Sequence, residues 1–410
     1  MKTRENRLVN NKLYNIIDNA YNNSDYYNLK FVNGINKEMS FKSIPILYKN
    51  DIQNEANNIL SRKFAYGKKK RLRVERTSGS TGKFTTVYWD KDEFNCSNMV
   101  LWRLRNKWYG ILPNSKCVTF NSLMFVGNKI HKPEKISYYG NNIMGLSKFH
   151  LTDEDFKEYC EAIRHFQPQW MSVQTSILSR LVEYMHRNNI RSFDTLKYIE
   201  LNGEMSLKTD KKYFQDFFNI PVANMYGATE VNGIAFECPC NKLHVLEENV
   251  YLESVEIEGI NTAVVTSLHN TAMPIIRYNL GDVLQLGERK KCECGMTSLY
   301  IETLQGRSSD VIELHNKQYV SPYIFLYCIE KVNEILYYPI LQFKIVQAQL
   351  DKIEILIVIR NDKMSWANET IKELKHMIEE MNLPIDIEII QVKDINQFGN
   401  VKFKFFEKHI

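Results

Sequence analysis

The sequence predicts a large N-terminal α/β domain followed by a small C-terminal α+β domain. Strand-like and helical runs alternate between about residues 72 and 283, which is typical of helices packed on a sheet. The C-terminal part instead follows the order strand–helix–strand–strand–helix–strand, which describes a compact α+β unit. With 44% hydrophobic residues over 410 positions, the chain also exceeds the ~250–300 residues at which a single core stops growing. We therefore place the domains at 1–305 and 306–410.

The expected large domain begins with helices and loops over residues 1–70. Its clearest helix covers 153–165, because Thr152 is a good N-cap and Asp155 follows three residues later as a capping-box partner. The other expected elements are a helix over 176–186 and short buried strands over 117–120, 196–201 and 221–225.

The centre of the small domain is predicted to be a β-hairpin. Residues 341–345 and 353–359 alternate apolar with polar side chains on either side of a turn at Asp351-Lys352, which gives the hairpin one buried face. The other expected elements are strands over 318–320 and 385–389 and helices over 323–335 and 371–381.

The charge and hydropathy patterns exclude two classes of partner. The formal net charge is +5, and 68–71 is the only dense basic run, whereas nucleic-acid-binding proteins usually gather such charge over a face. No stretch approaches the roughly 20 apolar residues of a membrane-spanning helix, and the N-terminus lacks the apolar core of a signal peptide. We expect a cytoplasmic protein that binds neither nucleic acid nor membranes.

The strongest motif is a loop of glycines and hydroxyl side chains, Thr77-Ser78-Gly79-Ser80-Thr81-Gly82-Lys83. The glycines allow a tight turn close to an anion, the hydroxyl and N–H groups can bind phosphate oxygens, and Lys83 adds positive charge. The loop is not the ordinary P-loop, because Thr77 replaces the first glycine and Phe84 follows the lysine. It is either a phosphate-binding loop or an exposed polar linker.

Four further motifs follow this loop along the chain. They are Leu201-Asn202-Gly203-Glu204, Met225-Tyr226-Gly227-Ala228-Thr229-Glu230, Arg277-Tyr278-Asn279-Leu280-Gly281-Asp282 and Gly306-Arg307-Ser308-Ser309-Asp310. In this order, the set resembles the adenylate-forming superfamily of acyl-CoA synthetases, peptide-synthetase adenylation domains and luciferases. The run 274–278 and the nearby Cys-x-Cys-Gly are similar to its phenylacetate–CoA ligase-like branch, which includes capsule-biosynthesis relatives. The resemblance implies an adenylate-forming large domain with a small C-terminal lid domain.

The resemblance implies that two of these motifs bind adenine. Asn202, Gly203 and Glu204 correspond to the adenine-contacting turn. Tyr226, followed by Gly227, offers a flat ring on which a base can stack, an interaction worth about 1–3 kcal/mol for nucleic-acid bases. Taken alone, Tyr226 would be an ordinary core tyrosine, so this role depends on the ordered set of motifs.

The other residues of the set match phosphate, metal and ribose positions. Thr229 can donate to the α-phosphate, and the carboxylate of Glu230 suits a Mg²⁺ that bridges the phosphates of ATP. Asp282 can accept from both ribose hydroxyls, and Arg307 can reach the ribose or a phosphate. Asp310 corresponds to the hinge before the lid. Each of three residues also has a plain structural alternative. Glu230 could be a solvated surface residue, Asp282 could cap a turn, and Arg307 could form a surface ion pair.

One expected catalytic residue departs from the pattern. The superfamily has a lysine near the chain end that follows a glycine, but the aligned position here is Asn400. A shift of two residues in the loop would bring Lys402 to that position, and a longer shift would bring Lys404; we favour Lys402. If neither residue reaches the site, adenylation should be slow.

The resemblance implies an enzyme that activates a carboxylic acid with ATP and Mg²⁺ as an acyl-AMP. The acyl group would then pass to a thiol, either of coenzyme A or of a separate carrier protein. An amide-forming ligase with an amine acceptor, and a nucleotide-binding protein that has lost turnover, are the alternatives. The branch favours an aryl or arylacetic acid, and Trp102, Trp108 and Trp170 either line its pocket or fill the core. A homodimer is compatible with this class of enzyme.

A second site is predicted from the cysteines. Four of the eight form two Cys-x-Cys pairs, Cys238-Pro239-Cys240 and Cys292-Glu293-Cys294, and His244 follows the first pair. Soft ligands of this kind suit a tetrahedral structural Zn²⁺; free loop cysteines are the alternative. We select Cys238, His244, Cys292 and Cys294 as the zinc ligands, with Cys240 as a substitute.

Overall fold

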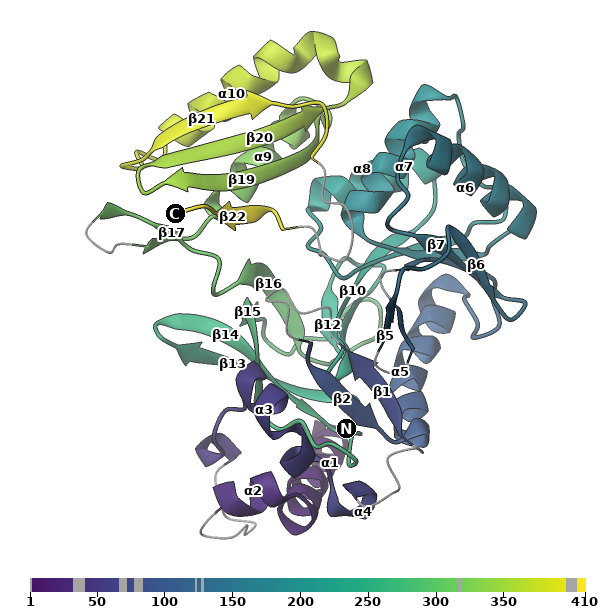
Figure 1. Ribbon diagram of the computed structural model, residues 1–410, viewed down its shortest axis with the longest axis vertical. Coiled ribbons are helices and arrows are strands. Elements are labelled where there is room, and N and C mark those ends of the chain that lie inside the picture. Colours follow the sequence, from purple (N-terminus) through teal and green to yellow (C-terminus); the bar gives the residue numbers. More distant parts are fainter. Residues whose placement is uncertain are drawn as a thin grey trace. The chain divides into compact units, whose positions relative to one another are not determined.

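The structure is a computed structural model in which the chain forms two compact units. The first unit comprises residues 1–113 and 225–308, and the second comprises 114–224 and 309–410 (Figure 1). The structure describes residues 2–31, 41–65, 72–76, 84–121, 124–126, 129–315, 319–395 and 404–410. Each unit contains its own hydrophobic core.

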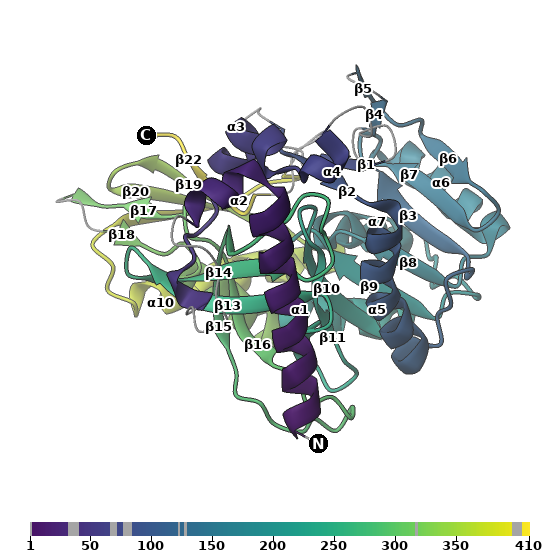
Figure 2. The same cartoon turned by 90° about the horizontal axis from the view of Figure 1, so that it is seen from below.

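The first unit packs N-terminal helices against antiparallel strands. Its helices are α1 (Lys2–Asn23), α2 (Asp25–Lys30), α3 (Lys49–Ile59), α4 (Arg62–Ala65) and α5 (Lys91–Tyr109), with a 3₁₀ turn at Phe41–Ser43. Figure 2 shows α1 lying across β13 and β14, and Ile16 and Ala20 of this helix share a core with Val265. The helices expected over residues 1–70 are thus confirmed for the described part of that range.

From β10 (Val222–Ala228) onward, the strands of the first unit follow one another without intervening helices. The strands of this unit are β1 (Arg73–Arg76), β2 (Thr86–Trp89), β10, β11 (Asn232–Glu237), β12 (Leu243–Val245), β13 (Val250–Ile257), β14 (Ile260–Ser267), β15 (Tyr278–Leu286) and β16 (Tyr300–Arg307). Strands β10 to β16 lie in the order β13-β14-β15-β16-β12-β11-β10, and neighbours are antiparallel. The α/β alternation expected up to about residue 283 therefore ends earlier, because antiparallel neighbours need only short turns, not crossover helices.

The second unit begins with a mainly parallel sheet covered by three helices. Its elements are β3 (Cys117–Asn121), β4 (Met124–Val126), β5 (Lys129–His131), β6 (Ile136–Tyr139), β7 (Ile143–Ser147), α6 (Asp153–Phe166), β8 (Trp170–Val173), α7 (Thr175–Arg187), β9 (Tyr198–Asn202) and α8 (Lys208–Phe218). The strand order is β9-β8-β3-β7-β6, with only β6 antiparallel to its neighbour. The capping box predicted for α6 is present: the N–H of Asp155 donates to Thr152 Oγ1 (3.2 Å) and the N–H of Thr152 donates to Asp155 Oδ2 (2.9 Å).

A separate small sheet domain completes the second unit. Its elements are β17 (Ile312–Glu313), β18 (Tyr319–Val320), α9 (Ile324–Ile335), β19 (Ile340–Gln349), β20 (Lys352–Ile359), a 3₁₀ helix (Asn361–Trp366), α10 (Ala367–Glu379), β21 (Asp386–Gln391) and β22 (Phe406–Lys408). The predicted β19–β20 hairpin is confirmed, and Ile345, Ile353 and Ile355 on its inner face are fully buried against α9 and α10.

The strand at one edge of the small sheet is not the one that the sequence predicts. The sheet order is β21-β20-β19-β22, whereas β18 pairs with β17 in a separate two-stranded ribbon. The fourth strand is β22, whose pairing with β19 is parallel and spans only three residue pairs. A strand this short carries too little periodicity to be recognised from the sequence.

Polar contacts attach the small domain to α8. The hydroxyl of Tyr338 donates to Asp210 Oδ1 (2.6 Å), and the N–H of Lys208 donates to Glu330 Oε1 of α9 (2.8 Å). The ring of Tyr338 also stacks on Tyr213 with centroids 4.3 Å apart. Through these contacts, Asp210 at the start of α8 is held against the small domain.

Among the described helices, none is long and apolar enough to cross a lipid bilayer.

Candidate functional site

The predicted phosphate loop and lysine lie outside the described residues. This applies to all of Thr77–Lys83 and to Lys402, together with Asn400. Their roles therefore stay predictions. The remaining candidate residues fall into three clusters, two in the first unit and one in the second.

A tight hairpin turn presents Thr229 and Glu230 in the first unit. Strands β10 and β11 are joined by residues 229–231, and the N–H of Val231 donates to the carbonyl of Ala228 (3.1 Å). A Cβ on Gly227 would lie 2.7 Å from the backbone oxygen of Asn232, so only glycine allows the two strands to approach this closely. The chain therefore needs glycine at the third position of the motif to form the turn.

The acidic residue of the ribose motif meets the tyrosine of the adenine motif. The Tyr226 hydroxyl on β10 donates to Asp282 Oδ2 on β15 (2.6 Å), although the residues are 56 positions apart. Asp282 Oδ1 lies 3.0 Å from Nε of Arg307, its register partner on β16. Arg307 also donates through Nη1 to the carbonyl of Leu280 (2.6 Å). Three residues predicted from three separate motifs are thus brought together at one carboxylate.

A second tyrosine binds the other predicted acidic residue. The Tyr278 hydroxyl, at the start of β15, donates to Glu230 Oε1 (3.0 Å). Both residues are buried, with 7% of Glu230 and 4% of Tyr278 exposed. The sequence analysis assigned no role to Tyr278, and the signal that could have found it is its place within the same motif as Asp282.

Burial and the two carboxylates keep both tyrosines protonated. Burial raises the pKa of Tyr226 far above its ordinary value, and the neighbouring Asp282 raises it further. Burial likewise raises the pKa of Tyr278, with Glu230 adding to the effect. A phenol that stays neutral remains a hydrogen-bond donor at every physiological pH. Each phenol therefore continues to donate to its carboxylate and holds it in place.

The turn predicted to contact adenine lies in the second unit. Gly203 adopts a left-handed conformation (φ +76°) directly after β9, which a side chain would strain. Asn202 Nδ2 donates to Ser172 Oγ (2.7 Å) at the end of the neighbouring parallel strand β8. The carboxylate of Glu204 accepts from the N–H of Ser176 (3.0 Å), in the first turn of α7. Glu204 thereby caps a helix whose own N-cap, Gln174, makes no side-chain cap.

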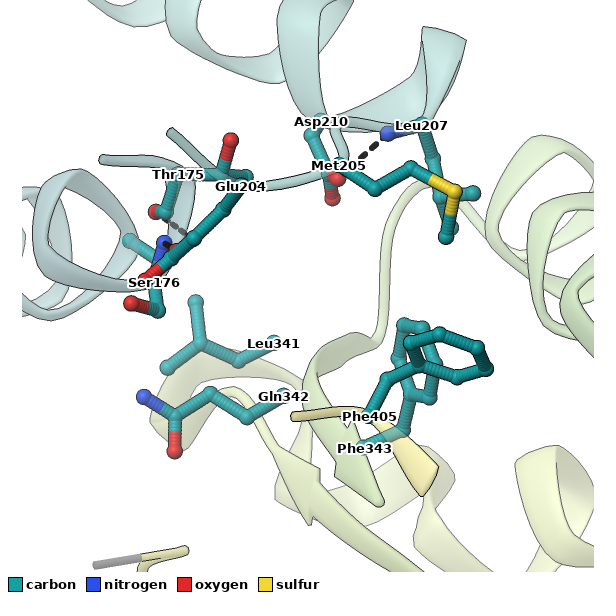
Figure 3. A pocket seen from close by; sticks show the side chains of 11 residues that line it. Thr175, Ser176, Glu204, Met205, Leu207, Asp210, Leu341, Gln342, Phe343 and Phe405 are labelled. Atoms are coloured by element: carbon teal, nitrogen blue, oxygen red, sulfur yellow. Dashed lines mark hydrogen bonds between the residues drawn. The ribbon is translucent and has the colours of Figure 1, made fainter. Parts of the chain in front are cut away.

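An open pocket adjoins this turn. It measures about 530 Å³, including space that is continuous with solvent, and lies beyond the carboxyl ends of β8 and β9. Figure 3 shows Thr175 and Glu204 on one side of it and Leu341, Phe343 and Phe405 of the small domain on the other. The carboxyl ends of parallel strands are the usual place for ligands in open α/β sheets.

The predicted zinc ligands form a compact cluster in the first unit. The ligand atoms of Cys238, His244, Cys292 and Cys294 all lie within 4.8 Å of one another. The sulfurs of Cys238 and Cys292 are 3.9 Å apart, and Cys294 Sγ is 3.4 Å from His244 Nε2. Pairing of β12 with β11 and β16 carries His244 to this place. The substitute candidate Cys240 is half-exposed and is not part of this four-residue group.

The cluster has the dimensions of a tetrahedral zinc site. With Zn–S about 2.3 Å and Zn–N about 2.05 Å, tetrahedral geometry gives S···S edges of about 3.8 Å and S···N edges of about 3.6 Å. The Nδ1 atom of His244 lies 3.2 Å from Ser298 Oγ, the kind of contact that orients a ligating imidazole. Burial and the charge of Lys242 lower the pKa of His244, so its ring is neutral at pH 7 and free to ligate. The residues present therefore fit Zn²⁺.

The three tryptophans considered for an acid pocket contribute to packing. Trp108 stacks on Phe236 (centroids 5.6 Å apart), and Trp170 stacks on Tyr198 and is only 6% exposed. The guanidinium of Arg105 lies over the ring of Trp102, 4.6 Å from its centroid. The structure supports the core-filling role for Trp170, which is buried, whereas Trp102 and Trp108 are half-buried.

Sequence comparisons find similarity to CapK and to phenylacetate-coenzyme A ligases. No family model matches the chain. It is 26% identical over 384 residues to protein CapK of Staphylococcus aureus, covering 91% of this chain and 82% of CapK. It is also 26% identical to phenylacetate-coenzyme A ligase of Escherichia coli (strain K12), over 72% of this chain and 69% of that enzyme.

Comparison with solved structures identifies the fold. A 2-hydroxyisobutyryl-CoA ligase in the postadenylation state, in complex with R3-HIB-AMP, matches with a TM-score of 0.76 and 15% identity, over 98% of this chain and 89% of that one. The anthranilate CoA ligase AuaEII in complex with anthranoyl-AMP matches with a TM-score of 0.55 and 13% identity, over 81% of this chain and 66% of that one. The chain is thus similar in sequence to CapK and to phenylacetate-coenzyme A ligases, and it shares its fold with CoA ligases that form acyl-AMP. The resemblance inferred from the motifs is thereby confirmed.

The motifs found in the sequence are divided between the two units. Tyr226, Glu230, Asp282 and Arg307 lie in the first unit, with the cysteine cluster. The turn 202–204, with Gly203 at its centre, lies in the second unit. Within the first unit, contacts of 3.0 Å or less join residues of three motifs into one polar cluster.

Proposed function

We propose that this protein is an AMP-forming ligase that activates a carboxylic acid with ATP and transfers the acyl group to the thiol of coenzyme A. The observation that carries the proposal is the convergence of Tyr226, Glu230, Asp282 and Arg307, which come from motifs spread over more than 80 positions. Relatives named phenylacetate-coenzyme A ligase, and similar structures of CoA ligases that hold acyl-AMP, support the reaction type. The phenylacetate and anthranilate ligases among them favour an aryl or arylacetic acid as substrate.

The cluster supplies groups suited to the nucleotide. Asp282 accepts hydrogen bonds from the ribose hydroxyls, and Arg307 neutralises its charge from the other side. Glu230 is the protein carboxylate for a Mg²⁺ that would otherwise be bound by ATP phosphates and water, the usual arrangement for this ion. Mg²⁺ would neutralise charge on the phosphates of ATP. Thr229, half-buried beside Glu230, donates to the α-phosphate.

The chemistry consists of two displacements. A carboxylate oxygen of the acid attacks the α-phosphorus, the bond between Pα and the bridging oxygen breaks, and pyrophosphate leaves. The thiol sulfur, after losing its proton, then attacks the acyl carbonyl carbon, and AMP leaves. In the first step, positioning and charge neutralisation by residues of the loop Thr77–Lys83, Thr229 and Lys402 would provide most of the rate enhancement.

We also propose that Cys238, His244, Cys292 and Cys294 bind a structural Zn²⁺. All four ligand positions are filled by protein side chains, whereas catalytic zinc keeps one position open for water or substrate. The site ties the β11–β12 turn to the segment before β16, and thereby supports the part of the first unit that lies between the adenine and ribose motifs.

ATP–pyrophosphate exchange tests the function directly. Purified protein is incubated with Mg²⁺, ATP, labelled pyrophosphate and a panel of aryl, arylacetic, fatty and amino acids. We expect exchange with one class of acid. Subsequent addition of coenzyme A, a phosphopantetheinylated carrier protein or an amine then identifies the acceptor.

Two isosteric variants and one control link the activity to the site. Glu230→Gln and Asp282→Asn should each lower exchange strongly, by the ~10²–10³-fold typical of losing one stabilising group in an active site. Glu248→Gln, which alters an exposed glutamate paired with Arg103, should leave it unchanged. ATP binding without exchange for every acid would point instead to a nucleotide-binding protein that has lost turnover.

A further inference from the structure

Two tyrosine–carboxylate hydrogen bonds connect the adenine and ribose motifs reciprocally. Tyr226 belongs to the motif that contains Glu230, yet its hydroxyl donates to Asp282 (2.6 Å). Tyr278 belongs to the motif that contains Asp282, yet its hydroxyl donates to Glu230 (3.0 Å). Each motif thus holds the acidic side chain of the other, within a single compact unit.

In the Tyr226–Asp282 pair, each residue lies beside an irregularity in its strand. The β10–β11 register shifts between Tyr226 and Gly227, and the β15–β16 register shifts between Asp282 and Val283. A bulge of this kind turns a side chain away from the regular alternation of the strand, and bulges are frequent beside active sites. The two residues that meet therefore both lie at a point where the strand changes its facing.

We propose that Tyr226 and Tyr278 are positioning residues with separate tasks: Tyr226 acts through Asp282 on recognition of the ribose, and Tyr278 acts through Glu230 on affinity for Mg²⁺. This inference rests on the proposed function. It adds a role for the Tyr226 hydroxyl besides the stacking role of its ring, and it assigns a role to Tyr278.

The chemistry of a tyrosine partner suits both tasks. Glu230 is buried, and a buried carboxylate without any hydrogen-bond donor is costly. A phenol satisfies one lone pair and fixes the rotamer, but unlike lysine or arginine it leaves the full negative charge for a cation. Asp282 receives Tyr226 on Oδ2 and Arg307 on Oδ1, which fixes the plane of the carboxylate while each oxygen keeps a lone pair for a ribose hydroxyl.

The size of the effect follows from comparable contacts. Loss of a hydrogen bond to a charged group typically changes an equilibrium constant about 10–150-fold, and loss of a residue that orients a metal ligand typically lowers metal affinity about 10–100-fold. We therefore expect about a tenfold effect on the matching ligand for each tyrosine. The non-matching ligand should be nearly unaffected, because each hydroxyl contacts only one of the two carboxylates.

The test measures two ratios on the full-length chain carrying Tyr226→Phe or Tyr278→Phe. The first ratio compares the apparent KM for 2′-deoxyATP with that for ATP in pyrophosphate exchange. The second ratio compares the Mg²⁺ concentration for half-maximal rate (the Mg²⁺ midpoint) in the variant with that in wild type. Tyr226→Phe should bring the first ratio close to one by weakening ATP about tenfold, and leave the Mg²⁺ midpoint unchanged. Tyr278→Phe should raise the Mg²⁺ midpoint about tenfold and leave the nucleotide ratio unchanged.

A matched control and a double variant distinguish positioning from general destabilisation. Tyr159→Phe removes another buried hydroxyl, which donates to the carbonyl of Ser147 (2.9 Å) in the second unit, and should move neither ratio. In the background of Asp282→Asn, Tyr226→Phe should have no further effect on the nucleotide ratio, because the carboxylate through which Tyr226 acts has been removed. The non-additivity of the two substitutions can be measured even if the single variant is less stable.

The outcomes separate the inference from the function on which it rests. If wild-type protein exchanges pyrophosphate but each phenylalanine variant changes both ratios equally, or neither, the positioning roles are wrong while the function stands. If wild-type protein shows no exchange, equilibrium binding of ATP and 2′-deoxyATP with and without Mg²⁺ supplies the same two ratios. Absence of nucleotide binding would overturn both.

Discussion

The buried carboxylate of Asp210 should make the stability of the second unit depend on pH. Asp210 lies in the first turn of α8, where Oδ2 accepts from the N–H of Leu207 (2.8 Å) and Oδ1 accepts from Tyr338 of the small domain (2.6 Å). Only 8% of the residue is exposed. Burial raises its pKa from 3.8 to about 6; the hydrogen bonds from Tyr338 and Leu207 oppose this rise, and the nearby charge of Glu330 adds to it.

The magnitude follows from the difference between the folded and unfolded pKa values of Asp210. Below about pH 4 both states are protonated, and the residue contributes its full stability. As the pH rises, the unfolded state loses its proton first, so the contribution declines until the folded state also ionises near pH 6. A difference of about two pKa units corresponds to about 3 kcal/mol at 1.36 kcal/mol per unit. Stability is therefore lost as the pH rises from about 4 to above 6.

Asp210→Asn removes this titration while it keeps an amide oxygen that can accept a hydrogen bond. We expect the difference in unfolding free energy, variant minus wild type, to increase by up to about 3 kcal/mol between pH 4.5 and 7.5. Urea unfolding followed by tryptophan fluorescence at four pH values measures this difference, in which the titration of other groups cancels. Asp216→Asn is the matched control, because Asp216 is exposed on the same helix and pairs with Lys212.

A constant difference across this range would refute the reasoning, since it would mean that Asp210 ionises alike in the folded and unfolded states. A difference that falls as pH rises would reverse the sign and show that the charged form is the stabilised one. The Asp216→Asn control should stay within about 0.5 kcal/mol of wild type at every pH.

Further predictions concern the metal cluster, the hairpin turn and a buried ion pair. Purified protein should contain one zinc per chain by mass spectrometry, and Cys292→Ser should lower both zinc content and melting temperature, whereas Cys96→Ser, at an exposed cysteine outside the cluster, should change neither; zinc-free wild-type protein of full stability would contradict this. Gly227→Ala forces its Cβ to within 2.7 Å of a backbone oxygen in β11, so it should cost about 1–3 kcal/mol and reduce exchange; an unaltered melting curve would show that the turn can relax. In the wild-type protein, the carboxylate of Glu253 lies 3.1 Å from Nε of Arg277. Arg277→Met leaves this carboxylate buried without its partner, and should cost about 3–5 kcal/mol in urea unfolding. Combining it with Glu253→Gln should recover part of that loss; strictly additive effects would argue against a coupled pair.

Local features of the chain were predictable because their physical causes lie within a few residues. The α6 capping box needs only Thr152 and Asp155, and both hydrogen bonds are present. The β19–β20 hairpin follows from strict alternation around one turn, and its inner isoleucines are buried. Similarly, the residue types and order of the metal cluster limited its ligands to five candidates, because few side chains bind zinc.

Pairings across the sheet were not predictable from these patterns. Tyr226 and Asp282 are 56 positions apart, and Tyr278 and Glu230 are 48 apart, so their contacts depend on strand order and register. Bulges beside Tyr226 and Asp282 then change which way the side chains face, and apolar periodicity does not reveal such bulges. The same limit explains why β22 was missed and why β18 was expected in the small sheet.

The sequence by itself determined the resemblance to adenylate-forming proteins, the α/β and α+β character of the parts, and the residue types of both candidate sites, since these depend on local pattern and motif order. Only the tertiary structure decided that His244 lies with Cys238, Cys292 and Cys294, that Glu204 caps α7, and that each motif's tyrosine holds the other motif's carboxylate. The physical reason is that hydrogen bonds and metal sites require atoms within about 3–4 Å of one another. Long-range packing alone sets such distances between residues that are far apart in the chain.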